Sequence, residues 1–226
     1  MGYEFIKNLK YLTSCFLDLI YNSGEECIAC GEYANSKSLL CERCNSSIKL
    51  CNKSFEITIH GHSMSCYSSF YYSGLGKQLI GRLKYKSDFR AGDALVEYML
   101  YTIKFNDVKF DTVTYVPCSK ATMKKRGYNQ SQYLAKKIGH NTNTKVLTLL
   151  KKIKHTKDQI GLSGEERWEN LQGAFLAINE NEIKNKKILL VDDVITTGAT
   201  AFYCSRLMME KGAVSVCILT GAKSSI

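Results

Sequence analysis

The sequence predicts an α/β protein with a mostly parallel sheet flanked by helices, preceded by a small cysteine-rich module. Through the C-terminal part of the chain, apolar segments typical of strands alternate with segments of helical periodicity, which is the pattern of a parallel sheet. Four cysteines near the N-terminus fall into two closely spaced pairs. The length of 226 residues suits one full domain and a smaller module, at about 150 residues per domain. We therefore expect a module over residues 1–62 and a domain over residues 63–226.

The individual elements are predicted from hydrophobic periodicity. An amphipathic helix is expected over residues 3–21, packed on the protein itself; a helix on a membrane surface is the less favoured alternative. Strands are expected over 63–72, 112–116, 145–150, 173–178, 187–191 and 214–219, and further helices over 77–85, 91–105, 128–139 and 199–211. Two polar segments, 117–127 and 154–170, are predicted to be loops.

Positive charge is concentrated in one part of the chain. The net charge is +10, from 31 basic and 21 acidic residues. Between Thr112 and Lys157 there is no Asp or Glu, and eleven residues are Lys or Arg. Such a segment attracts phosphorylated small molecules or nucleic acid. A solvated lysine-rich surface with no ligand is the alternative.

The sequence also bears on the compartment. No stretch of about 18 apolar residues occurs, so no transmembrane helix is expected. The apolar segment from Cys15 to Tyr21 is interrupted by Asp18 and lacks the cleavage site of a signal peptide. We therefore expect a cytosolic protein, in which the ten cysteines are thiols or metal ligands and not disulfides.

Cys27, Cys30, Cys41 and Cys44 form the pattern C-x2-C-x10-C-x2-C. Four thiolates at this spacing can surround Zn²⁺ as a tetrahedron, and a closed four-thiolate site is structural and not catalytic. A redox dithiol is the alternative, but it would not explain two matched pairs. Four further residues lie nearby at spacings that match no common zinc finger, so ordinary roles are expected for Cys51, His60, His62 and Cys66, with a second metal site as the less favoured alternative.

The most specific pattern follows the strand expected over residues 187–191. Two acids, Asp192 and Asp193, come directly after its apolar residues, at the end where open α/β sheets bind ligands. A turn of small residues then opens a helix, so its backbone N–H groups and hydroxyls can hold a phosphate. Its residues are Thr196, Thr197, Gly198, Ala199 and Thr200. The acids suit sugar hydroxyls or a metal-bound group. With hydroxyls at the acids and a phosphate at the turn, the pattern indicates a ribose 5-phosphate; a helix cap with surface acids is the alternative.

This stretch resembles the phosphoribosyl pyrophosphate (PRPP) motif of type I phosphoribosyltransferases. The resemblance implies a phosphoribosyltransferase-like domain in which the turn holds the 5-phosphate. It assigns the catalytic positions to Asp192 and Asp193, which would orient the sugar and offset positive charge on its ring. Mg²⁺ is the implied cofactor, bound together with PRPP.

Further segments resemble the ComF family of competence proteins. They are Val116-Pro117 with Lys124 to Gln130, then Asp158 to Ser163 with Arg167, Asn170, Gly173 and Phe175, and the cysteine module. The resemblance spans about residues 12–222, and the chain departs from the family pattern at Thr122 and Ile160. It implies pyrophosphate contacts from Lys120 and Arg126. Arg167 would reach a phosphate from a closing loop, or pair with a neighbouring glutamate.

Three functions follow from the resemblance and the charge. The favoured one is a DNA-uptake factor that has a PRPP site and binds single-stranded DNA through Lys84, Lys124, Lys125 and Arg126. The second is an active phosphoribosyltransferase with an unidentified acceptor. The third is a scaffold whose zinc module docks a helicase of DNA uptake.

Overall fold

The computed structural model describes residues 26–35, 38–51, 53–59, 61–154 and 171–224, which separate into two compact units. One unit ends at Ser47 and the other begins at Ile48. The expected helix over 3–21, His60 and the loop residues 155–170, Arg167 among them, lie outside the described residues. No helix in the described ranges is long and apolar enough to cross a membrane.

In the N-terminal unit, each cysteine pair forms a tight turn. The N–H of Gly31 donates to the carbonyl of Cys27, and Gly31 adopts a φ of 76°, which a glycine accepts without strain. The second pair surrounds the start of the short helix α2 (Glu42–Ser46), where the N–H of Asn45 donates to the carbonyl of Cys41.

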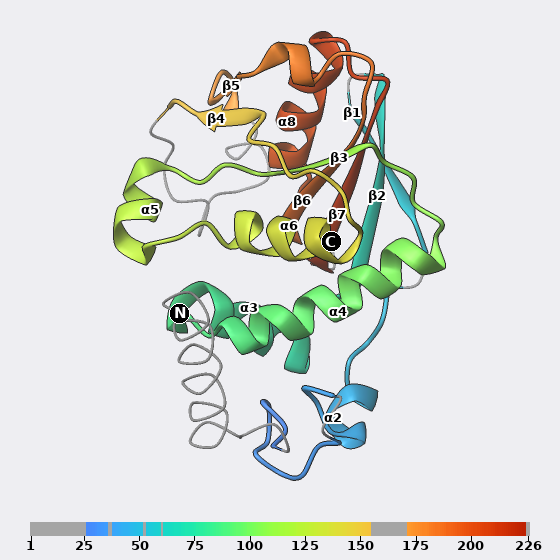
Figure 1. The fold of residues 1–226 in the computed structure, drawn as a ribbon, viewed down its shortest axis with the longest axis vertical. Coiled ribbons are helices and arrows are strands. Elements are labelled where there is room, and N and C mark those ends of the chain that lie inside the picture. Colours follow the sequence, from blue (N-terminus) through green and yellow to red (C-terminus); the bar gives the residue numbers. More distant parts are fainter. Residues whose placement is uncertain (1–25, 36–37, 52, 60, 155–170, 225–226) are drawn as a thin grey trace, which may run out of the picture. The chain divides into compact units, whose positions relative to one another are not determined.

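The larger unit is built on a five-stranded sheet with the order β1-β2-β7-β6-β3 (Figure 1). Its strands are β1 (Phe55–Ile59), β2 (His62–Tyr71), β3 (Thr112–Tyr115), β6 (Lys187–Ile195) and β7 (Ser215–Lys223). Only the pairing of β1 with β2 is antiparallel within this sheet. The expected α/β class and mostly parallel sheet are therefore confirmed.

Helices cover both faces of the sheet (Figure 1). They are α3 (Gly74–Lys86), α4 (Phe89–Phe105), α6 (Gln130–Asn141) and α8 (Ala199–Glu210). On one face, Phe202 of α8 shares a buried cluster with Ile188 and Leu190 of β6. The alternate residues Leu189 and Val191 are equally buried and point the other way, toward the face on which α3, α4 and α6 pack. This double burial explains why the β6 sequence is continuously apolar.

Two differences from the expected elements lie before and within the basic segment. The boundary between the units is at residue 47 and not 62, because β1 pairs with β2 and so belongs to the larger sheet. The segment expected as a loop over 117–127 contains α5 (Lys120–Arg126). The Ser119 side chain caps its first turn by accepting from the Thr122 N–H, and Gly127 ends it with a φ of 83°.

The remaining differences concern strand ends. Only Val146 of the strand expected over 145–150 pairs with β3, as an isolated parallel bridge. The chain then forms β4 (Leu150–Lys152), which pairs antiparallel with β5 (Phe175–Ala177) in a separate small sheet. A 3₁₀ turn at Glu180–Glu182 follows. β6 is longer than expected and runs through both aspartates to Ile195.

The order of the strands predicts a crevice between β3 and β6. The connection through α6 leads from β3 outward to Val146, whereas the connection through α8 leads from β6 in the opposite direction to β7. Where successive connections diverge in this way, a gap opens at the carboxyl ends of the two strands. Asn129, a buried residue, caps α6 and donates from Nδ2 to the carbonyl oxygen of Val116 at 2.9 Å, so it ties the start of α6 to the residue that follows β3.

Candidate functional site

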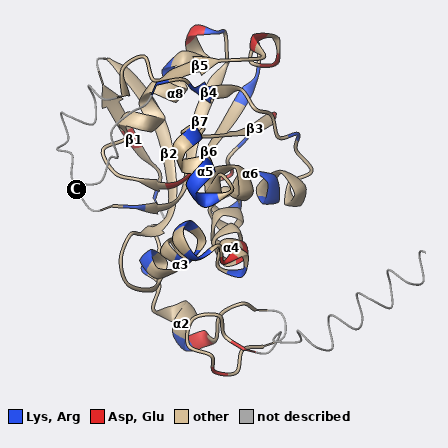
Figure 2. Ribbon diagram, turned by 90° about the vertical axis from the view of Figure 1, so that its left-hand side faces the viewer, with Lys and Arg blue, Asp and Glu red and all other residues tan. Residues whose placement is uncertain are grey.

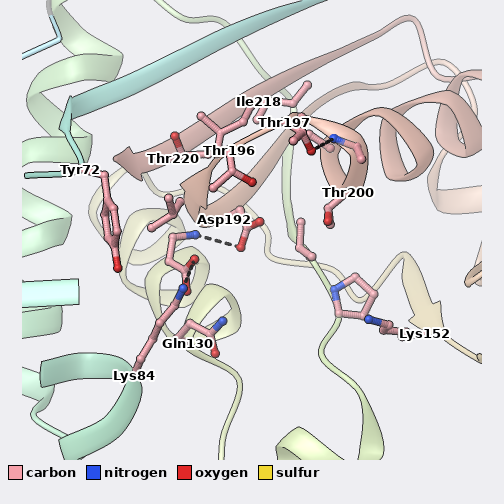
Figure 3. A pocket seen from close by; sticks show the side chains of 18 of the residues that line it. Tyr72, Lys84, Gln130, Lys152, Asp192, Thr196, Thr197, Thr200, Ile218 and Thr220 are labelled. Carbon is pink, nitrogen blue, oxygen red and sulfur yellow. Dashed lines mark hydrogen bonds and ion pairs between the residues drawn. The ribbon is translucent and has the colours of Figure 1, made fainter. Parts of the chain in front are cut away.

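A cavity of about 470 Å³ opens at the carboxyl ends of β3 and β6 (Figure 3). The strand ends contribute Val116 and Pro117 on one side and the whole stretch from Asp192 to Ala201 on the other. The remaining lining residues are Tyr72, Lys84, Tyr85, Gln130, Lys152, Phe175, Ile218 and Thr220. The cavity therefore contains every acid and every turn residue that the sequence singled out.

Asp192 lies in the middle of this site. Its Oδ1 accepts hydrogen bonds from the Ser131 hydroxyl at 2.8 Å and from the Asp193 N–H at 2.9 Å. Burial beneath the cavity, followed by the charge of Asp193, raises the pKa of Asp192 to about 7, although Ser131 and Lys84 oppose the shift. The carboxyl of Asp192 thus changes its charge near neutral pH.

This raised pKa predicts how stability depends on pH. Between about pH 4 and pH 7 the folded protein keeps a proton on Asp192 that the unfolded chain has released, so the free energy of unfolding falls as the pH rises. Asp192→Asn removes this contribution. In urea denaturation at several pH values, we expect Asp192→Asn to gain stability over the wild type steadily from pH 4.5 to 7.5. A difference that stays constant over this range would contradict the prediction.

Asp193 is held by a buried ion pair. The Nζ of Lys84 lies 2.8 Å from its Oδ1, and the two side chains are 19% and 5% exposed. Burial works against the charge of Lys84, but the Asp193 carboxylate raises the pKa of Lys84 above its usual value. The other oxygen, Oδ2 of Asp193, is buried with no hydrogen-bond partner among the described residues. The pair therefore depends on a single strong contact.

The turn after β6 forms another wall of the cavity. Gly198 adopts a φ of 78° and begins α8, and the Thr197 hydroxyl oxygen accepts from the Ala199 N–H at 3.5 Å. A Cβ atom at Gly198 would lie 2.7 Å from Cδ1 of Ile57 in β1. The turn thus requires glycine both for its backbone conformation and for its packing against β1.

Some of the basic residues expected at the site line the cavity, and others lie outside it. Lys84, expected to face nucleic acid, lines the cavity, whereas Lys120, Lys124 and Lys125 are exposed on α5 and do not line it. Arg126 does not line the cavity either, but it contacts two residues that do, Tyr85 and Gln130. Its guanidinium stands 5.6 Å from the ring centre of Tyr85 and donates a hydrogen bond to Gln130 Oε1.

Several residues that line the cavity were not among the ligand contacts expected from the sequence. Lys152 and Phe175 arrive from the small β4–β5 sheet, and Tyr72 follows the end of β2. Ser131 could have been suspected, because it lies at the start of the helix that follows β3. The others become neighbours only through the tertiary fold.

In the N-terminal unit, Cys27, Cys30, Cys41 and Cys44 come together as predicted, with all four Sγ atoms within 4.8 Å of one another. The Sγ atoms of Cys30 and Cys41 lie 3.7 Å apart. Sulfurs at about 2.3 Å from a tetrahedral Zn²⁺ would be about 3.8 Å apart, so this cluster can hold a metal ion. It is the only such cluster of His, Cys or acidic residues in the described part of the chain.

The thiols of this cluster differ in acidity. Burial would raise the pKa of Cys27, but N–H groups of Cys41, Cys30 and Ala29 lower it to about 6. Burial raises the pKa of Cys44 to about 12. The thiol of Cys27 is therefore more acidic than that of Cys44.

Comparison with solved structures gives weak likenesses. Adenine phosphoribosyltransferase from Thermoanaerobacter pseudethanolicus is similar with a TM-score of 0.41 and 12% identity, over 80% of this chain and 98% of that one. The enzyme described as APRTase from Giardia lamblia gives a TM-score of 0.42 and 16% identity, over 81% and 96%. Both TM-scores are below 0.5.

Comparison with curated proteins is more specific, although no protein-family model matches. Competence protein F of Haemophilus influenzae is 28% identical over 83% of this chain and 81% of its own length. Competence protein ComFC of Bacillus subtilis is 28% identical over 70% and 63%. ComFC of Streptococcus pneumoniae is 30% identical over 69% of this chain and 67% of the relative. With this identity over two thirds of the relative, the chain belongs to the ComF family of competence proteins.

Proposed function

We propose that this chain is a ComF-type protein of DNA uptake whose cavity binds PRPP or a closely related phosphorylated ribose. The observation that supports this most is the arrangement of the paired aspartates. Asp192 and Asp193 lie near the C-terminal end of the buried strand β6 and share one cavity with the turn Thr196–Thr200. The names of the curated relatives support the biological role, and the cavity supports the ligand.

The chemistry of the cavity suits this ligand. The turn precedes the N-terminus of α8, where N–H groups and the helix dipole attract a phosphate. Asp192 stands apart from the turn and would repel a phosphate, but its carboxylate can accept hydrogen bonds from the ribose hydroxyls. Mg²⁺ binds one or two carboxylates together with substrate phosphates. Here Asp192 would contribute the protein oxygen, because Lys84 already holds Asp193, and the ion would neutralise the pyrophosphate.

Calorimetry with PRPP and Mg²⁺ tests the proposal. We expect the wild type to bind, and Asp192→Asn to bind at least about tenfold more weakly, because a charged acceptor is lost from a desolvated site. Asp107→Asn is the matched control, since Asp107 is an exposed acid paired with Lys109. Absence of heat with the wild type, or equal binding by both variants, would refute the site. Measuring the release of pyrophosphate from PRPP with a panel of acceptors would test the second function expected from the sequence, the transfer of phosphoribosyl to an acceptor.

We also propose that the exposed basic face of α5 binds single-stranded DNA. Figure 2 shows basic residues, in blue, on α5. Lys124 and Lys125 are exposed in its last turn, next to Arg126. The ring of Tyr85, over which Arg126 lies, belongs to a residue that is 69% exposed and is accessible to a base. A basic surface beside an accessible ring is the combination that binds single strands without sequence preference.

Salt titration tests the DNA surface. Fluorescence anisotropy with a labelled oligothymidylate should show affinity that falls steeply with salt, because each neutralised phosphate of a single strand contributes about 0.7 to the logarithmic slope. Lys124→Gln/Lys125→Gln should therefore lower the slope by about 1.4. Lys49→Gln/Lys53→Gln changes the net charge equally at exposed positions outside the basic segment, and it should leave the slope unchanged. Equal changes of the slope in both double variants would show that DNA binding follows the net charge of the protein and not the surface of α5.

For the cysteine cluster we propose a structural Zn²⁺. Cys44→Ser should abolish the binding of one zinc per chain, because three thiolates hold a structural ion far less well than four. Zinc released by a thiol reagent and measured colorimetrically gives the stoichiometry. Cys118→Ser, at a half-buried thiol outside the cluster, is the control and should retain the metal. Docking of a helicase on this unit, and a cytosolic location, stay predictions.

A further inference from the structure

The ammonium group of Lys84 is a fixed cation within the cavity. It comes from the last turn of α3, and its side chain is only 19% exposed, so the protein holds it in place. An ammonium has three N–H donors, and Asp193 Oδ1 accepts one of them. Because Lys84 also lines the cavity, its remaining donors are close to the space that a ligand would fill.

The position of Lys84 is as informative as its charge. Figure 3 shows Asp192 between Lys84 on one side and the threonine side chains of the turn, such as Thr200, on the other. A ligand that places a phosphate at the turn and its hydroxyls at Asp192 therefore extends its opposite end toward Lys84. The cavity thus has a centre for hydroxyl groups and a place for an anion on each side.

The charge balance of the acids supports this arrangement. Two ionised carboxylates alone would repel an anion at their end of the cavity. Lys84 cancels the charge of Asp193, which leaves the cluster of Lys84, Asp192 and Asp193 with at most one negative charge. With its partner almost fully buried, Lys84 is the member of the pair that can face an anionic ligand.

We propose that Lys84 binds the anionic group on the anomeric carbon of the ligand, so that the site selects a pentose with anionic groups at both ends over one with a single 5-phosphate. This inference depends on the proposed function, and it adds a residue that determines which phosphorylated pentose is preferred. Lys84 is then a ligand-binding residue in addition to the partner of Asp193.

The test measures a preference and not only an affinity. Calorimetry with PRPP and with ribose 5-phosphate, at one fixed Mg²⁺ concentration, gives the ratio of the two dissociation constants for each protein. The informative comparison is Asp193→Asn against Lys84→Met/Asp193→Asn. Both lack the buried carboxylate, so they differ only in the ammonium. Lys84→Gln/Asp193→Asn, which can keep a neutral hydrogen bond, is the second variant should the methionine variant fold poorly.

We expect the loss of the ammonium to weaken PRPP binding by about tenfold or more and to leave ribose 5-phosphate within about threefold. Equal losses for both ligands, or no loss for either, would overturn the role of Lys84. Wild-type protein that binds neither compound would overturn the proposed function, and this inference with it. Wild-type protein that binds both, with an unchanged ratio in the variants, would overturn this inference alone.

Discussion

Replacing Lys84 with methionine should lower the free energy of unfolding by about 3–5 kcal/mol, because it leaves the buried carboxylate of Asp193 without a counter-ion. The Asp193 side chain is 5% exposed, and its Oδ2 already lacks a hydrogen-bond partner in the described structure. Urea denaturation of the full chain at pH 7, monitored by circular dichroism, measures the loss. The double variant Lys84→Met/Asp193→Asn should regain most of it, since the uncompensated charge is gone.

The chain offers a matched control for this loss. Lys137 and Asp93 form an ion pair with the same separation of 2.8 Å, but their side chains are 43% and 38% exposed. Lys137→Met should therefore cost no more than about 1 kcal/mol, because water screens the remaining charge. If Lys84→Met lowered the free energy of unfolding as little as Lys137→Met does, water would reach and screen the carboxylate of Asp193, and the prediction would be wrong. Failure of the double variant to recover would show that Lys84 stabilises the fold by packing and not by charge.

The parts of the site that the sequence predicted are those that lie next to one another in the chain. The acids and the turn after β6 are contiguous, so a single strand end and the following helix bring them into one cavity. The cysteines come as two local pairs, and each pair needs only a tight turn to present both thiols. In both cases local geometry determines most of the arrangement. Long-range packing only has to bring together two short segments.

The parts that the sequence did not predict depend on distant neighbours or on weak local signals. The contacts of Asp193 with Lys84 and of Asp192 with Ser131 join three separate elements, and no spacing predicts such pairs. The helix α5 buries none of its residues, so it has no apolar periodicity to detect. Its caps, Ser119 and Gly127, are the residues in the sequence that indicate this helix.

Substituting alanine for Gly198 should weaken binding of PRPP by at least about tenfold, since a shift of a few tenths of an ångström in the turn misplaces its phosphate donors. Two causes act together. Alanine at a φ of 78° costs about 1–2 kcal/mol, and its Cβ would approach Cδ1 of Ile57 to 2.7 Å. Calorimetry gives the affinity, and thermal unfolding shows whether the variant remains folded.

Two further variants separate these causes. Gly61 lies in the turn between β1 and β2 and has the same φ of 78°. No atom lies within 4 Å of a Cβ added there, so Gly61→Ala introduces the backbone strain without the steric contact. It should lose stability but bind PRPP as the wild type does. Gly198→Ala/Ile57→Ala removes the contact and keeps the strain. Recovery of affinity in this double variant would assign the loss to packing of the turn against β1. A persistent loss would assign it to the backbone conformation, and unchanged affinity in Gly198→Ala itself would place the phosphate elsewhere in the cavity.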